Sequence, residues 1–108
     1  MDAHMDMSIV DWRSGRVIHW DLSLIDVARP IAEQIDNLKE DLAQIEYPND
    51  IVIDVGWHPE FRRNGRFVVS VIGHQDWERP LMQARCVLPK RLLMLLREAV
   101  SVAMNEQS

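Results

Sequence analysis

Three stretches of alternating apolar residues, separated by short polar connections, constrain the fold more than any other feature of the sequence. They run from Ile51 to Trp57, from Phe67 to Ile72 and from Leu81 to Leu88. Because successive side chains of a β-strand point to opposite faces, each stretch has the period of a strand with one buried face. The short connections favour antiparallel pairing. We therefore predict a three-stranded antiparallel meander in the middle of the chain.

The segment before the meander predicts a β-hairpin. Ile9–Trp12 and Val17–Trp20 are short apolar runs that flank the polar sequence Arg13-Ser14-Gly15-Arg16. Gly15 can supply the positive φ that a tight hairpin turn requires. An isolated hairpin is only marginally stable in water, so this one has to pack on the rest of the fold or pair with it.

From Ser23 the apolar period changes from two to between three and four, which is typical of an amphipathic helix. The residues of this stripe are Leu24, Ala28, Ile31, Ile35, Leu38, Leu42 and Ile45. The spacing predicts one long helix that ends before Tyr47-Pro48. Pro30 requires either that the helix begins near Asp26 or that it kinks at the proline.

A closing helix is predicted from Pro89, a residue that suits the first turn of a helix. Its apolar face comprises Leu92, Leu93, Leu95, Leu96, Ala99, Val100 and Ala103. The predicted order is therefore ββαβββα, an α+β fold in which both helices cover one face of the sheet. The other face would bear Asp54, Ser70, Gln83 and Arg85 and stay in contact with water.

A chain of 108 residues is long enough for one hydrophobic core, so we expect a single domain over residues 1–108. Residues 1–7 are expected to be disordered or tag-like. They show no basic start followed by an apolar run, which argues against a secretory signal, and no stretch approaches the roughly 20 apolar residues of a membrane span. The single cysteine, Cys86, cannot form an internal disulfide and is expected to be buried. A soluble cytoplasmic protein fits these features.

The charge is distributed unevenly along the chain. The formal net charge is −5, but residues 1–60 contain 4 Lys and Arg against 13 Asp and Glu, whereas residues 61–108 contain 8 against 4. An acidic first half argues against nucleic-acid binding, because phosphate contacts need clustered basic residues. It favours a basic protein partner.

Catalytic patterns are weak. His58-Pro59-Glu60 and His74-Gln75-Asp76 could together offer two histidines and two carboxylates to a metal ion, which would make a small metal-dependent hydrolase. No HExxH, GxSxG, P-loop or GxGxxG motif accompanies them. We therefore expect no catalytic residues, no metal and no cofactor, and keep the hydrolase as the less favoured alternative.

The two loops that connect the three predicted meander strands have the composition of a protein interface, because each mixes an aromatic residue with charged residues. Packing at the edge of the core is the alternative role for these aromatic residues, and Trp77 is the better interface candidate because carboxylates flank it. A third candidate surface is the acidic strip on the outward side of the predicted helix. The candidate partner-binding residues are Asp26, Glu33, Asp36, Glu40, Asp54, Trp57, Glu60, Asp76, Trp77 and Glu78.

Three motifs resemble a pattern found in small bacterial immunity proteins of contact-dependent growth inhibition and related polymorphic toxin systems. They are Asp54-Val55-Gly56-Trp57-His58-Pro59-Glu60-Phe61, Asn64-Gly65-Arg66-Phe67 and Asp76-Trp77-Glu78-Arg79-Pro80-Leu81. The resemblance covers residues 50–100, and Arg62-Arg63 departs from it. It implies a cytoplasmic antidote that binds the C-terminal domain of a cognate toxin, often a nuclease, and blocks its active site or substrate groove.

A second class of binding protein remains open from the sequence. A homodimeric accessory or regulatory domain could pair through a sheet edge or through the N-terminal hairpin. In the immunity hypothesis the free protein is a monomer or a weak dimer, its partner is basic, and it contacts neither nucleic acid nor membrane directly.

Overall fold

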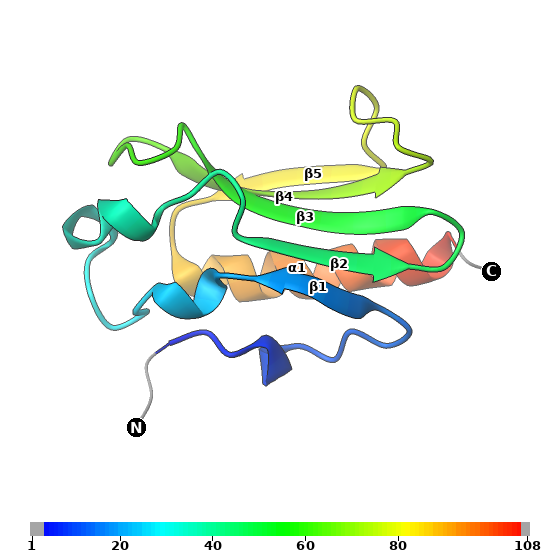
Figure 1. Cartoon of the computed structure of the whole chain (residues 1–108), viewed down its shortest axis with the longest axis horizontal. Coiled ribbons are helices and arrows are strands. Elements are labelled where there is room, and N and C mark those ends of the chain that lie inside the picture. The colour runs from blue at the N-terminus through cyan, green and yellow to red at the C-terminus, as the bar shows by residue number, and fades with distance from the viewer. Residues whose placement is uncertain (1–3, 107–108) are drawn as a thin grey trace.

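The computed structural model describes residues 4–106, and most of their regular structure is one antiparallel sheet followed by one helix (Figure 1). The five strands pair in chain order, so the sheet is a simple meander. The strands and the helix are β1 (Arg16–Trp20), β2 (Ala43–Tyr47), β3 (Ile51–His58), β4 (Arg66–Gly73), β5 (Met82–Cys86) and α1 (Pro89–Asn105). None of the described helices is long and apolar enough to cross a membrane.

The sheet has one covered face and one uncovered face, which we call the core face and the open face. Alternate residues of β3 and β4, among them Ile53, Val55 and Val69, are fully buried on the core face. There α1 packs against β3, β4 and β5 through an apolar stripe that includes Leu92 and Leu96. In the part of the chain that the structure describes, no α-helix covers the open face, and Figure 1 shows α1 along the opposite side of the sheet.

Several predictions from the sequence are confirmed. The protein is α+β, the strands β3, β4 and β5 coincide with the three alternating stretches, and α1 begins at Pro89. Cys86 is buried beside α1, and burial raises the pKa of its thiol, an effect that nearby Arg91 partly offsets. The packing of apolar strand faces on one amphipathic helix accounts for these elements.

The long helix predicted from Ser23 to Ile45 is wrong. This stretch contains three short 3₁₀ turns joined by irregular segments, namely η2 (Leu22–Leu24), η3 (Ile31–Glu33) and η4 (Ile35–Asn37), and it ends in strand β2. Pro30 is extended, with ψ 138°, and immediately precedes η3 rather than continuing a helix. The buried side chain of Gln34 accepts from the Asp26 N–H and donates to the Asp26 and Arg29 carbonyls. This side chain therefore satisfies backbone groups that helical hydrogen bonds would otherwise satisfy.

The predicted N-terminal hairpin is also wrong in its first half. Met7–Ile9 form a 3₁₀ turn, η1, capped by the Asp6 carboxylate, and β1 pairs with β2 instead. Within residues 4–7, part of the segment expected to be disordered or tag-like, Met5 is 5% exposed and its carbonyl accepts from the Trp20 indole, whereas the other three residues are exposed. Residues 1–3 lie outside the described residues. The correct order is thus five strands and one helix rather than ββαβββα.

Candidate functional site

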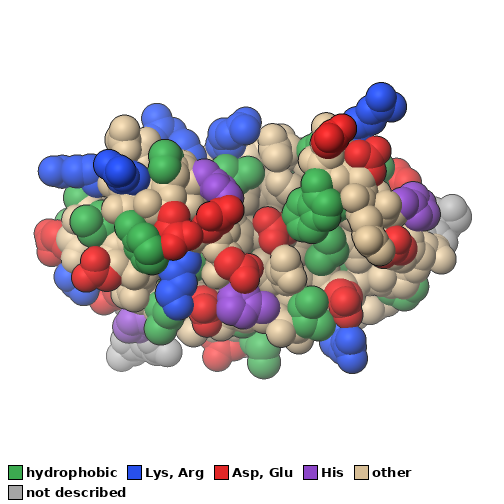
Figure 2. All heavy atoms as spheres, turned by 45° about the horizontal axis from the view of Figure 1, so that its top comes forward, with side chains coloured by type: hydrophobic (Ala, Val, Ile, Leu, Met, Phe, Trp, Pro, Cys, Tyr) green, Lys and Arg blue, Asp and Glu red, His purple; other side chains and the backbone are tan. Residues whose placement is uncertain are grey.

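A groove of about 490 Å³ lies on the open face. Four carboxylates line it, from Glu40, Asp41, Asp54 and Glu60, and no lysine or arginine is among its lining residues. Figure 2 shows acidic and histidine side chains gathered in the middle of one face of the molecule. The open face is therefore a place where negative charge is concentrated along a concave surface.

Two of these carboxylates lie on a bulge. The Trp57 N–H donates to the Lys39 carbonyl at 2.8 Å, and the Leu42 N–H donates to the Val55 carbonyl at 2.9 Å. Glu40 and Asp41 thus stand opposite the single residue Gly56, which is the two-against-one arrangement of a β-bulge. A Cβ on Gly56 would lie 1.9 Å from the Glu40 carbonyl oxygen. Only glycine therefore allows the backbone of the bulge to pack this closely against β3.

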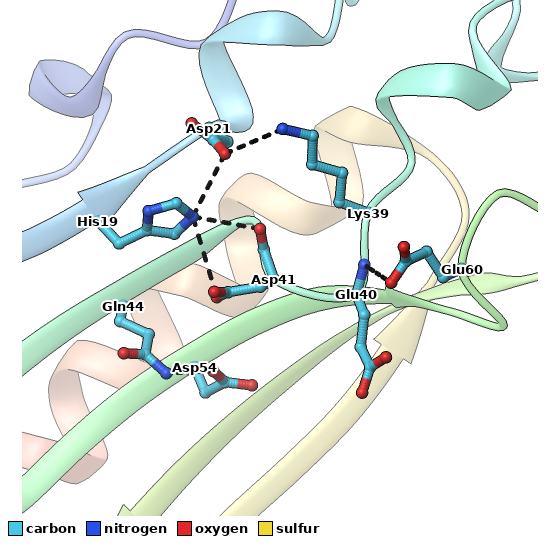
Figure 3. A network of polar contacts seen from close by, with 8 residues as sticks. All are labelled: His19, Asp21, Lys39, Glu40, Asp41, Gln44, Asp54 and Glu60. Carbon is cyan, nitrogen blue, oxygen red and sulfur yellow. Dashed lines mark hydrogen bonds and ion pairs between the residues drawn. The ribbon is translucent and has the colours of Figure 1, made fainter.

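Glu60 also holds the bulge in place, because its carboxylate accepts a hydrogen bond from the Glu40 N–H at 3.2 Å (Figure 3). Glu60 follows the end of β3, whereas Glu40 precedes β2. This hydrogen bond brings two carboxyl-bearing residues from separate segments to the same end of the groove.

The floor of the groove is a polar row across four strands. Gln44 of β2, Asp54 of β3, Ser70 of β4 and Gln83 of β5 are register partners in turn. Gln44 donates to the Asp54 carboxylate at 3.0 Å, and Gln83 donates to the Ser70 hydroxyl at 3.2 Å. The side chains of the row are therefore held in place by one another.

Asp54 is a partly buried carboxylate of the groove, and its pKa is raised above the ordinary 3.8. Burial is the largest cause, and the negative charges of Asp41 and Glu40 add to it. The Gln44 hydrogen bond and nearby His58 act in the opposite direction. A nearby cation would favour the ionised form of this group.

A second cluster borders the groove on the β1 side (Figure 3). His19 Nε2 lies 3.2 Å from the Asp41 carbonyl oxygen and 3.4 Å from the Asp21 carboxylate. Lys39 Nζ lies 3.3 Å from the same Asp21 oxygen. Lys39 is therefore engaged by Asp21, and in the described part of the chain no lysine or arginine pairs with Glu40, Asp41, Asp54 or Glu60.

Trp77 lines the groove and differs from the other three tryptophans. The indoles of Trp12, Trp20 and Trp57 each donate to a backbone carbonyl. Among the described residues the Trp77 indole has no such acceptor, and this residue is 53% exposed. A large aromatic surface with an unused N–H donor thus lines the same groove as the carboxylates.

The sequence-predicted residues divide into three groups. Glu40, Asp54, Glu60 and Trp77 meet at the groove. Asp76 and Glu78 are exposed on the β4–β5 loop but do not line the groove. Trp57 is wrong as a contact residue, because it is fully buried and packs edge-on against Phe67 with a ring separation of 4.9 Å.

The predicted acidic helix strip does not exist as one surface. Asp26 lies in the connection between η2 and η3, Glu33 lies in η3 within 3.9 Å of Arg29, and Asp36 lies in η4. Because these three residues do not lie on a common helix, they do not form one continuous acidic surface with Glu40. Sequence reasoning missed Asp41, Gln44 and His19. The signal available was the adjacent pair Glu40-Asp41 at the start of an alternating strand.

The four residues considered for a metal site do not converge. His58 and Glu60 lie at the β3–β4 turn, whereas His74 and Asp76 lie on the β4–β5 loop, at the other end of the antiparallel sheet (Figure 1). Among residues 4–106 no group of three or more His, Cys, Asp or Glu side chains could hold a metal ion.

Comparison with known proteins gives no relative: no family model, no curated protein and no solved structure matches this chain. The functional argument therefore rests on the groove itself.

Proposed function

We propose that this protein is an immunity protein, which binds a basic toxin domain, a nuclease in particular, and neutralises it by occupying its substrate groove in the cytoplasm. The observation that supports this most directly is the groove lined by four carboxylates and no lysine or arginine. In this proposal the protein performs no chemistry of its own.

Electrostatic complementarity is the first support. A nuclease must hold a polyanionic backbone and so needs a cationic groove. Among the described residues no lysine or arginine pairs with Glu40, Asp41 or Glu60, and only His19 lies near one of them, with its Nε2 3.9 Å from the Asp41 carboxylate. The chain carries a net charge of −5. Such a surface is attracted to a cationic groove at a distance, which gives fast and salt-sensitive association.

Preorganisation is the second support. The Glu40–Asp41 bulge is held by backbone hydrogen bonds to β3, by the Glu60 carboxylate and by its contact with Gly56. Gln44 orients Asp54 in the same way. Because these groups are already ordered, binding costs little further conformational entropy at the charged centre of the surface.

Trp77 is the third support. Tryptophan is enriched among the residues that dominate binding energy, and its indole can bury apolar area while donating one hydrogen bond. Its face can also receive an arginine or lysine of the partner. We assign Trp77 as the anchor and the carboxylates as the groups that select a basic partner.

The hypothesis predicts that a neighbouring gene encodes a large secreted protein whose C-terminal domain is the toxin. The test titrates the purified protein with that domain by calorimetry, and a basic nuclease domain from an unrelated protein is the negative control. We expect a one-to-one complex. The groove variant Glu40→Lys, Asp41→Lys, Glu60→Lys should weaken binding by about 100-fold or more, because several close charge pairs are reversed together.

The matched control is Glu33→Lys, Asp36→Lys, Glu98→Lys, which alters exposed residues away from the groove. Each triple variant removes three negative and adds three positive charges, so both change the net charge from −5 to +1. The control should bind within about threefold of the unaltered protein at physiological salt, where distant charges are screened. Equal weakening by both variants would mean that the groove is not the contact surface.

A further inference from the structure

The two edges of the sheet differ in how well they are protected. Strand β1 is interrupted by a bulge between Val17 and His19, and the N-terminal segment contacts it through the Trp20 indole. Strand β5 pairs with β4 over five residues without interruption, and within residues 4–106 no strand lies on its outer side (Figure 1). An unprotected edge offers backbone N–H and C=O groups to another strand.

The side chains around β5 add an apolar component to this edge. Leu81 is 43% exposed, Val87 is 37% exposed and Leu88 is 67% exposed. Single exposed apolar residues are common on protein surfaces, but these three stand at the two ends of one edge strand. Between them the open-face positions Gln83 and Arg85 are polar and are also exposed.

We propose that β5 is a self-association edge, at which a second copy of this chain pairs antiparallel about a two-fold axis at Ala84. In that register Leu81 lies opposite the partner copy's Val87, and Gln83 lies opposite its Arg85. The sequence around Ala84 is thus self-complementary, with apolar residues facing apolar residues and an amide facing a guanidinium. A two-fold interface requires this kind of self-complementarity.

The pairing joins two five-stranded sheets into one and leaves both grooves on the same side. The two Asp54-bearing strands would be five strand spacings apart, about 24 Å, which exceeds the screening length of about 8 Å at physiological salt. Repulsion between the two acidic grooves therefore does not oppose association. The four groove carboxylates stay uncovered, and Gln83 is shared between the groove floor and this edge. Because self-association is measured without the toxin partner, this proposal and the proposed function can succeed or fail independently.

The first test is analytical ultracentrifugation of the full chain over a concentration series. A dimer of twice the 12.6 kDa chain mass should appear as concentration rises. A monomer at every concentration up to about 1 mM, where specific association would be negligible, overturns the proposal.

Two substitutions at one exposed position test the register. Gln83→Glu places a carboxylate opposite the partner copy's Arg85 and should tighten the dimer by about two- to tenfold, whereas Gln83→Arg places like charges together and should weaken it by a similar factor. Equal dimer constants for the two variants would mean that the copies associate through another surface.

Disulfide trapping provides a readout that does not depend on affinity. In a Cys86→Ser background, Ala84→Cys should cross-link to itself, because opposite residues of paired strands lie within disulfide range. The Leu81→Cys chain alone should not form a cross-linked dimer. A mixture of the Leu81→Cys and Val87→Cys chains should form one. Cross-linking of Leu81→Cys to itself would contradict the proposed register.

Discussion

The backbone carbonyl of Glu40 occupies the space that a side chain on Gly56 would need. A Cβ at that position would lie 1.9 Å from the carbonyl oxygen and 3.0 Å from His58 Nε2. Glycine on β3 is therefore a condition for the bulge that carries Glu40 and Asp41 onto the open face.

Substitution of this glycine should destabilise the protein and disturb the groove together. Gly56→Ala should lower the free energy of unfolding by about 1–3 kcal/mol, because the obstructing atom belongs to the backbone and cannot rotate away. Gly73→Ala is the matched control, since a Cβ there meets only the flexible side chain of Leu81 at 3.0 Å. Urea titration compares the two variants, and equal losses would contradict the special role of the bulge.

The two meander tryptophans should respond in opposite ways to truncation. Trp57→Ala empties a fully buried site and should cost about 3–5 kcal/mol of unfolding free energy. Trp77→Ala removes a half-exposed side chain and should change stability by no more than about 0.5 kcal/mol. In the partner titration, however, Trp77→Ala should weaken binding by about 2 kcal/mol or more. Unchanged partner binding by Trp77→Ala would remove this residue as the anchor.

Asp54 should make the folded state less stable as pH rises. Its pKa is raised in the folded protein, mainly by burial, so the folded state holds this proton more tightly than the unfolded state. The stabilisation is complete below the ordinary pKa of 3.8 and is lost as pH rises through the folded pKa. Asp54→Asn removes this titration, so its stability relative to the unaltered protein should increase across that interval. If the difference in unfolding free energy between Asp54→Asn and the unaltered protein stays constant with pH, Asp54 does not titrate in this way.

Tyr47 carries a buried hydroxyl that has no hydrogen-bond partner among the described residues. Removal of an unsatisfied buried polar group relieves its desolvation penalty, so Tyr47→Phe should stabilise the protein by about 1 kcal/mol near neutral pH. Burial, with a smaller effect from Asp11, raises the pKa of Tyr47 from 10.0 to about 12. The unaltered protein should therefore lose stability as pH rises above 10, and the variant should lack this contribution. Thermal unfolding at pH 7 and pH 11 measures both effects, and a destabilised variant at pH 7 would point to an unseen partner for the hydroxyl.

The sequence predicts the second half of this fold well because local patterns decide it. Strands β3, β4 and β5 alternate cleanly, and Pro89 marks the start of an amphipathic helix. In the first half of the chain, the apolar residues spaced three to four apart lie partly on separate 3₁₀ turns, which have about three residues per turn, and not on one α-helix. Their stability depends on tertiary contacts, such as the buried Gln34 side chain, which a periodicity argument cannot detect.

The candidate site could be predicted only in part for a related reason. Strand alternation places Asp54 on the open face, and the flanking carboxylates favour Trp77 as an interface residue. The convergence of Glu40 with Glu60 depends on a bulge opposite Gly56, and nothing in the local sequence specifies that pairing. Trp57 was misjudged because an aromatic residue in a charged sequence context has the same composition whether it lies in the core or at an interface.

The most direct test of the binding face is a ¹⁵N NMR titration of the labelled protein with the purified basic partner domain. The four tryptophan indoles act as internal reporters, because only Trp77 lacks a backbone acceptor among the described residues. We predict that the Trp77 indole and the amides of Glu40, Asp41 and Asp54 shift, while the Trp57 indole and the buried positions of α1 stay unchanged. Shifts concentrated on α1, with the Trp77 indole unmoved, would contradict the account.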